Sequence, residues 1–335
     1  MARAEAAYPT VATQLSAMLL APVASLLGQK RLVIVADGLL QYIPFTALSD
    51  PTVVRADGGS FQPLVIKHEI ISLPSLSTLA ILRKEMPEKS RAKALVAVFA
   101  DPVFSKTDER VIAAKESKTE PTLSREFKRA MRDAGDIGSV DGSFRLDRLN
   151  FARSEADAII AAAPPGSSMQ AVDFEASRTR VLSPELKQYR IVHLVTHGIL
   201  NGNHPELSGL VFSLVDQHGQ TEDGFLKLND IYNMDLPLDM IVLSACETGL
   251  GKEVRGEGLV GLTRGFMHAG AARVVASLWK VDDEATSQLM KGFYSYLLEK
   301  KMPAAAALRL AQLDLRKTRS EPYSWAGFLL QGEWK

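Results

Sequence analysis

Cys246 and His197 are the residues of this sequence whose types could supply a nucleophile and its base. A free thiol is mostly protonated at neutral pH, and a neighbouring imidazole can take its proton and later protonate a leaving group. A cysteine beside a histidine is therefore suited to acyl transfer, in which the thiolate attacks a carbonyl carbon. Cys246 is the only cysteine in the 335 residues, so no other thiol competes for this role.

Both residues lie at the end of a run that is typical of a buried strand. The runs "RIVHLVTHG" (190–198) and "DMIVLSAC" (239–246) are short, apolar and bounded by small residues. Sites in parallel sheets form where the strands end, and neighbouring strands lie about 5 Å apart. If the two runs are parallel neighbours, the thiol and the imidazole emerge at the same edge of the sheet, within reach of each other.

Each of the two residues also has a purely structural interpretation. A lone buried cysteine usually packs as a small hydrophobic side chain, and a histidine at a strand end often only forms a structural hydrogen bond. Their matching positions on matching elements favour a catalytic dyad. Acyl transfer also needs hydrogen-bond donors for the oxyanion. The backbone N–H groups of Gly198 and Cys246 are the candidates, because both residues follow strand ends.

The predicted strand at 271–279 ends in Trp279 and is followed by acidic residues, and these side chains could receive a substrate side chain. Asp282 and Asp283 come just after Trp279, and Glu247 directly follows the cysteine. Acidic residues at this point also cap the helix that follows and suit its dipole, so at least one aspartate is expected to act as a cap. The functional interpretation is an acidic pocket that prefers Arg or Lys beside the dyad.

Two further patterns resemble metal or nucleotide sites, and the sequence argues against both. His193 lies four residues before His197, but four residues of strand span about 13 Å, too far to share an ion. The stretch "GEGLVG" (256–261) matches the dinucleotide pattern, which requires its glycines directly after a strand. The residues "ETGLGKEVR" separate it from the strand, so we predict no metal and no cofactor.

Composition limits the classes of protein that the chain could be. Lys plus Arg and Asp plus Glu both number 39, so net charge gives no case for nucleic acid or anionic membrane. A single cysteine excludes an intrachain disulfide and a multi-thiolate zinc site, and it fits a reducing, cytoplasmic location. No run approaches the roughly 18 apolar residues of a membrane span. Residues 15–28 are expected to form an amphipathic helix rather than a targeting peptide.

The order of the segments predicts an α/β fold. Apolar runs alternate with helical segments, the pattern of a mainly parallel sheet covered on both faces. We expect an N-terminal half at 1–104 and a C-terminal half at 151–335, the latter beginning with a helix capped by Ser154. Residues 105–150 are highly charged and predict a linker or mobile insertion with a short central helix. Strands are expected at 31–38, 93–102, 167–172, 190–198, 207–215, 239–246 and 271–279.

These segments resemble the CHAT domain, a caspase-like family in the clan of caspases, gingipains and separase. The phrases that carry the resemblance span nearly the whole chain: "LVIVADGLLQYIPFTAL", "LVAVFADPVF", "VHLVTHG", "IVLSACETGLG", "SLWKVDDEAT" and "YSWAGFLLQG". The resemblance implies a caspase-like three-layer α/β/α sandwich, with an N-terminal pseudo-caspase half packed against the catalytic half. His197 and Cys246 take the dyad positions, 49 residues apart (246 − 197), against about 50 in caspases.

The resemblance also implies what such a site would act on. "LWKVDDEAT" is similar to the separase phrase whose aspartate receives a basic P1 residue, and either Asp282 or Asp283 matches it. We therefore expect a cysteine endopeptidase that cleaves a partner protein, such as a gasdermin-like effector in bacterial defence, under a sensor or helical-repeat regulator. The alternatives are a catalytically idle interaction scaffold and a hydrolase or acyltransferase of small substrates.

Overall fold

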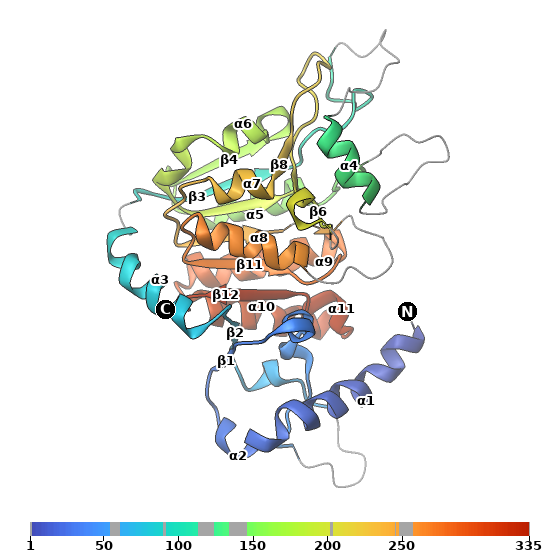
Figure 1. Ribbon diagram of the computed structural model, residues 1–335, viewed down its shortest axis with the longest axis vertical. Helices are drawn as coiled ribbons and strands as arrows, with labels where there is room; N and C mark the ends of the chain where they lie inside the picture. Colours follow the sequence, from blue (N-terminus) through green and yellow to red (C-terminus); the bar gives the residue numbers. More distant parts are fainter. Residues whose placement is uncertain are drawn as a thin grey trace.

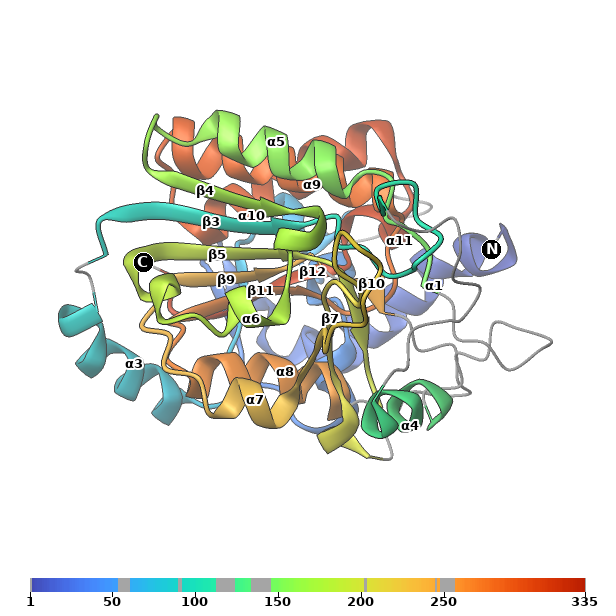
Figure 2. The same ribbon diagram turned by 90° about the horizontal axis from the view of Figure 1, so that it is seen from above.

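The structure is a computed structural model that describes residues 2–53, 61–89, 92–112, 124–133, 146–201, 204–244, 246–247 and 257–334. Within these residues the chain folds into one long twisted sheet with helices on both sides (Figure 1). A second, smaller sheet lies beyond one end of the central strands, as the view from above shows (Figure 2). The predicted three-layer α/β/α sandwich is confirmed.

Among the described residues the larger sheet has eight strands in the order β1-β2-β12-β11-β9-β5-β3-β4, and the smaller sheet has the order β10-β6-β7-β8. The strands are β1 (Leu32–Ile34), β2 (Ile70–Ser72), β3 (Ala94–Ala100), β4 (Ser168–Val172), β5 (Tyr189–Val195), β6 (His197–Ile199), β7 (Gly209–Val211), β8 (Phe225–Lys227), β9 (Met240–Leu243), β10 (Cys246–Glu247), β11 (Arg273–Ser277) and β12 (Phe328–Gly332).

The larger sheet is mainly parallel, as predicted. The neighbours β11, β9, β5, β3 and β4 all run in one direction. β12 is antiparallel to β11, and β2 and β1 follow the direction of β12. The parallel strands are apolar along their length because helices cover them on both faces. Strand β3 lies between β5 and β4 in the sheet although it precedes both in the sequence by more than 60 residues.

The helices are α1 (Ala2–Leu19), α2 (Ala24–Leu27), α3 (Leu76–Lys89), α4 (Arg125–Asp133), α5 (Ala152–Ala162), α6 (Arg178–Val181), α7 (Leu228–Tyr232), α8 (Glu257–His268), α9 (Asp283–Tyr294), α10 (Ala304–Thr318) and α11 (Pro322–Trp325). Helices α5, α9 and α10 cover one face of the large sheet, and α7 and α8 cover the other (Figure 2).

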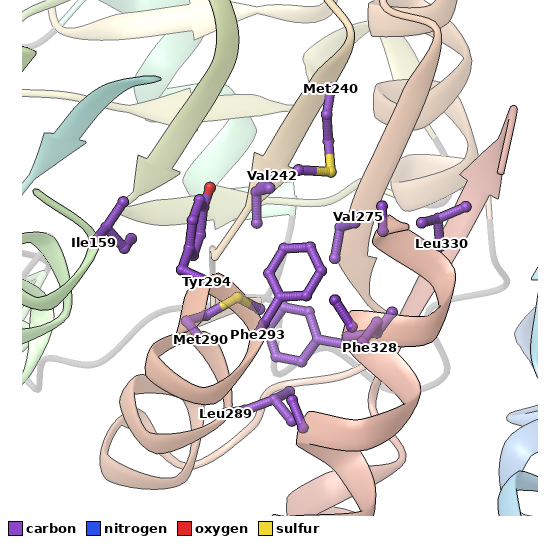
Figure 3. Packing of buried hydrophobic residues seen from close by; sticks show 14 of the residues in the cluster. Ile159, Met240, Val242, Val275, Leu289, Met290, Phe293, Tyr294, Phe328 and Leu330 are labelled. Atoms are coloured by element: carbon purple, nitrogen blue, oxygen red, sulfur yellow. The ribbon is translucent and has the colours of Figure 1, made fainter. Parts of the chain in front are cut away.

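Alternate residues of the strands point to the two faces and make two cores. On one face Val242 of β9 and Val275 of β11 pack against Leu289 and Phe293 of α9, as Figure 3 shows. On the other face Ile241 packs in a separate cluster with side chains from α7 and α8. Burying an aliphatic or aromatic side chain of this kind contributes on the order of 2 kcal/mol, so both layers hold the central strands in place.

Several local predictions differ from the structure. Ser154 lies inside α5 rather than capping it, because the helix begins at Ala152 after Phe151. The segment 15–28 is not one helix: α1 ends at Leu19 and a short helix resumes at Ala24. Strands β2, β8 and β12 were not predicted: β2 and β8 have only three residues each, and β12 alternates buried and half-buried positions. The short helix expected near the centre of 105–150 is α4.

No single helix in the described part of the chain is long and apolar enough to cross a bilayer. The two segments Ala7–Leu19 and Ala21–Leu27, bent by 54° at the break, satisfy the length and composition criteria only as a pair.

Candidate active site

His197 and Cys246 are brought together by two chain segments that run from the large sheet into the small one. β5 leads through Thr196 into β6, which begins with His197. β9 ends at Leu243, and β10 begins with Cys246. β5 and β9 are parallel neighbours, and so are β6 and β10. The register is unchanged across the break, because the same offset of 49 separates Leu194 from Leu243 (243 − 194) and His197 from Cys246 (246 − 197).

Cys246 therefore lies directly opposite His197 on a parallel ladder, and Glu247 lies opposite Gly198. Neighbouring strands are roughly 5 Å apart, which is the separation assumed from the sequence. The backbone of Cys246 and Glu247 is described, whereas their side chains and residues 248–256 lie outside the described part. Gly198 is the middle residue of β6, with Leu210 of β7 on its other side.

His197 is almost completely buried and is held by one hydrogen bond of its ring. The residue is only 6% exposed, and the centroid of its ring lies 5.1 Å from that of Phe104. Nε2 is 2.7 Å from the backbone carbonyl oxygen of Asp147. A carbonyl oxygen can only accept, so Nε2 carries the proton and Nδ1 carries the lone pair. Nδ1 is buried and has no hydrogen-bond partner among the described residues.

Burial holds the pKa of His197 below its usual value near 6.5, because the charged imidazolium loses its hydration. The positive charge of Lys280 acts in the same direction, whereas the Asp147 carbonyl favours the protonated ring and opposes the shift. At neutral pH the imidazole is therefore uncharged, with its basic nitrogen Nδ1 unprotonated. Such a ring can accept a proton from a thiol.

Asp147 was not predicted as a site residue, and no residue type could have signalled it. It acts through its main-chain carbonyl, which every residue possesses. It lies in the segment 146–150, at the C-terminal end of the charged stretch that was expected to be a linker. That part of the stretch therefore contacts the candidate site directly.

Asp282 caps the helix that follows, as one of the two aspartates was expected to do. Its carboxylate accepts the backbone N–H of Ala285 at 2.9 Å, at the N-terminus of α9. The same oxygen lies 3.3 Å from the guanidinium of Arg319, which also binds Glu284 at 2.6 Å. Half of the Asp282 side chain is exposed. Its carboxylate thus already holds a guanidinium.

Asp283 faces a different part of the chain. Its carboxylate accepts the backbone N–H of Phe151 at 2.9 Å, and Asn150 contributes a second backbone hydrogen bond. Burial raises the pKa of Asp283, and these two hydrogen bonds oppose the shift. This carboxylate therefore ties the segment that contains Asp147 to the start of α9.

Trp279 is a half-buried residue two positions after the end of β11. Its Nε1 donates to the carbonyl oxygen of Tyr323 at 3.0 Å, and its ring stacks on that of Tyr323 at a centroid distance of 6.3 Å. The structure thus gives Trp279 a packing partner from the segment after α10, near the acidic start of α9.

His193 is a core residue, which agrees with a strand spacing too long for it to share an ion with His197. It is fully buried, with Nε2 2.8 Å from Glu155 Oε1 and Nδ1 3.0 Å from the hydroxyl of Tyr294. Among the described residues no group of three or more His, Cys, Asp and Glu side chains is placed to hold a metal ion. Of the glycine pattern at 256–261, residues 257–261 lie within α8 and Gly256 lies outside the described part.

Comparison with known proteins places the chain in a defined family. A family model described as "CHAT domain" matches residues 9–333. Tetratricopeptide repeat protein 28 of Homo sapiens is 25% identical over 319 residues, which are 90% of this chain and 12% of that protein. The Mus musculus protein of the same name is 37% identical over 105 residues, covering 31% of this chain and 4% of that protein. The chain thus spans only a small part of these relatives.

Two solved structures are similar at low sequence identity. The separase–securin complex of Saccharomyces cerevisiae at 3.0 Å aligns with 90% of this chain and 15% of that chain, at 13% identity and a TM-score of 0.46. The Arg specific cysteine proteinase gingipain R aligns with 87% of this chain and 59% of that chain, at 11% identity and a TM-score of 0.45.

Proposed function

The chain belongs to the CHAT domain family, and on that premise we propose that it is a cysteine endopeptidase with Cys246 as nucleophile and His197 as general base. The observation that carries the proposal is the position of Cys246 opposite His197 on the parallel β6–β10 ladder. The unprotonated Nδ1 of His197, whose tautomer is fixed by Asp147, supports it.

In the proposed mechanism the dyad starts as a neutral pair, because the pKa of His197 is lowered. The thiol of Cys246 transfers its proton to Nδ1 as its sulfur attacks the substrate carbonyl carbon. The imidazolium then gives this proton to the leaving amine, and the peptide C–N bond breaks to leave a thioester. Water, deprotonated by the same nitrogen, attacks the thioester, and the proton returns to the departing thiol.

The tetrahedral intermediates need donors at the developing oxyanion. We propose the backbone N–H groups of Cys246 and Gly198. Gly198 lies one residue past the histidine and opposite Glu247 in the same ladder, so both amides lie next to the paired dyad residues.

The proposed substrate is a protein cleaved after Arg or Lys. Asp282 is the better of the two candidate aspartates for the P1 side chain, because it is half exposed and already binds a guanidinium, that of Arg319. Asp283 is engaged with backbone N–H groups. Glu247 is the last residue of β10 and Trp279 follows β11, and we propose that they flank the pocket. Protein partners are also proposed because the matched relatives are named for tetratricopeptide repeats.

The test is cleavage of a fluorogenic peptide panel with Arg, Lys, Asp or Leu at P1, by the wild type, Cys246→Ala and His197→Ala. We expect cleavage after Arg and Lys that both variants lose. Equal activity in Cys246→Ala would refute the mechanism, and preference for P1 Asp would refute the acidic pocket. A folded protein that cleaves none of the peptides, and no protein in a proteome-wide screen, would favour an interaction scaffold instead.

A further inference from the structure

The segment 146–151 is held at three points around the candidate dyad. The Asp147 carbonyl accepts from His197 Nε2 at 2.7 Å. Arg148 donates two hydrogen bonds to the Asp101 carboxylate, from Nε at 2.8 Å and from Nη2 at 2.7 Å. The Phe151 N–H donates to Asp283 at 2.9 Å. Residues 146–149 belong to no helix or strand, so the position of the Asp147 carbonyl depends on contacts such as these.

Asp101 is a firm anchor for this segment. It directly follows β3, whose last residue, Ala100, pairs with Val195, two residues before His197. The residue is 1% exposed and its backbone has φ 54°, a left-handed conformation that aspartate tolerates. The carboxylate therefore stands beside the strand end from which His197 emerges.

Three arginines share this carboxylate. Besides Arg148, Asp101 accepts Arg110 at 3.1 Å and lies 3.5 Å from Arg153. Removing Arg148 alone therefore leaves Asp101 paired, and no buried charge is stranded. This matters because a stranded buried charge would destabilise the whole fold and obscure a local effect.

We propose that Arg148 is a positioning residue for His197. Its two-pronged pair with Asp101 fixes the peptide group of residues 147–148, whose carbonyl oxygen holds the Nε2 proton of His197. Holding that proton keeps the lone pair on Nδ1, the nitrogen that must receive the thiol proton. This inference rests on the proposed function, because it assigns Arg148 a task in the same site.

The geometry of the pair requires arginine. A planar guanidinium binds a carboxylate with two parallel hydrogen bonds, whereas a lysine ammonium is a single point charge. Without the pair the Asp147 carbonyl can shift, and the imidazole can rotate or exchange its tautomer. A displacement of about 1 Å in a catalytic group can lower the rate about a hundredfold.

The test compares Arg148→Met and Arg148→Lys with Arg153→Met as the matched control. Arg148 and Arg153 are equally exposed, at 37% and 39%, and both contact Asp101. Two quantities are measured: the steady-state constants on the preferred peptide, and the proton NMR signal of the His197 Nε2–H, assigned by its absence in His197→Ala. A buried, hydrogen-bonded ring N–H exchanges slowly enough to be seen, and a solvated one does not.

We expect Arg148→Met to lose the N–H signal and about tenfold to a hundredfold in kcat, with KM little changed. Arg148→Lys should lie between it and the wild type, and Arg153→Met should keep the signal and stay within about twofold of wild-type kcat. The proposal is overturned if Arg148→Met keeps both the signal and kcat, or if Arg153→Met loses as much. If Arg148→Met does not fold, the lysine variant decides on the same two measurements.

The two proposals fail in different ways. A wild type without Cys246-dependent cleavage refutes the peptidase function, while the NMR comparison still shows whether Arg148 holds the His197 ring. An active wild type with an unaffected Arg148→Met variant refutes the positioning role alone.

Discussion

Asp282 and Arg319 form an ion pair at the start of α9, with Oδ1 and Nη1 3.3 Å apart. The residue that we propose for a basic substrate side chain is thus occupied by an arginine of the same chain, from the segment that follows α10. Both side chains are partly exposed, so the pair is worth little by itself and a substrate arginine can compete for it.

The first prediction concerns this competition. Asp282→Asn should raise KM for P1-Arg peptides about tenfold, because a charge-assisted hydrogen bond contributes roughly 1.5–3 kcal/mol. Arg319→Ala should lower KM for the same peptides, since the competitor is removed. Steady-state kinetics on paired P1-Arg and P1-Leu substrates measures both. Equal changes in KM for the P1-Arg and P1-Leu peptides would show that Asp282 does not bind the P1 side chain.

The second prediction separates the structural role of Asp283. Asp283→Ala removes the acceptor of the Phe151 N–H and should lower the free energy of unfolding by about 1–2 kcal/mol. Asp283→Asn keeps an acceptor oxygen and removes a carboxylate whose pKa is raised by burial, so it should stay within about 0.5 kcal/mol of wild type. Urea unfolding distinguishes them. Similar losses in both variants would mean that the charge, not the acceptor, matters.

The third prediction concerns pH. Because the folded pKa of His197 lies below its unfolded value near 6.5, the ring remains a base at mildly acidic pH. The acid limb of kcat/KM should therefore fall below pH 6.5. Between the two pKa values the unfolded chain binds the extra proton, so His197 weakens folding as pH decreases through that window. In His197→Gln this part of the pH dependence of stability should disappear; an unchanged profile contradicts the assignment.

The fourth prediction concerns the buried, hydrogen-bonded pair of His193 and Glu155. His193→Ala leaves the Glu155 carboxylate without its ring partner at a position with no exposure, and should destabilise by about 3–5 kcal/mol. Adding Glu155→Gln removes the stranded charge and should recover part of the loss. Denaturant unfolding of the single and double variants gives the coupling. The control is His204→Ala, whose exposed pair with Glu206 should matter by less than about 0.5 kcal/mol. Additive losses in the double variant would argue against a coupled pair.

The sequence was sufficient to predict the fold class and the edge at which the candidate residues lie. The apolar runs that end in His197-Gly198 and in Cys246 predict the two neighbouring strands, but each run contains two strands: β5 ends at Val195 and β6 begins at His197, and β9 ends at Leu243 and β10 begins at Cys246. The direct pairing of the two residues could not be read from the runs, because register depends on how β5 and β9 pack between the helices. The different roles of Asp282 and Asp283 could not be predicted either, because their partners Arg319 and Phe151 lie far from them in the sequence.

The residues that sequence reasoning missed act through features that residue type does not show. Asp147 contributes a main-chain oxygen, and Arg148 lies in a charged stretch in which many arginines look alike. The value of Arg148 depends on Asp101, 47 residues earlier. Asp101 has a left-handed backbone conformation directly after β3, and its residue type alone does not predict this. Contacts of this kind become visible only when the end of β3 is placed beside the end of β5.

The position of β3 between β5 and β4 also affects how the chain folds during synthesis and how a fragment without β3 would behave. During synthesis β3 emerges long before either neighbour, so it cannot pair on both sides until residue 195 has been added. A fragment that begins at residue 151 would keep the dyad strands but lack β3. The facing edges of β5 and β4 would then be unpaired and open to aggregation. Adding residues 92–150 as a separate peptide should restore both the missing strand and the Asp147 and Arg148 contacts around His197, and such complementation would offer a way to switch the candidate site on at will.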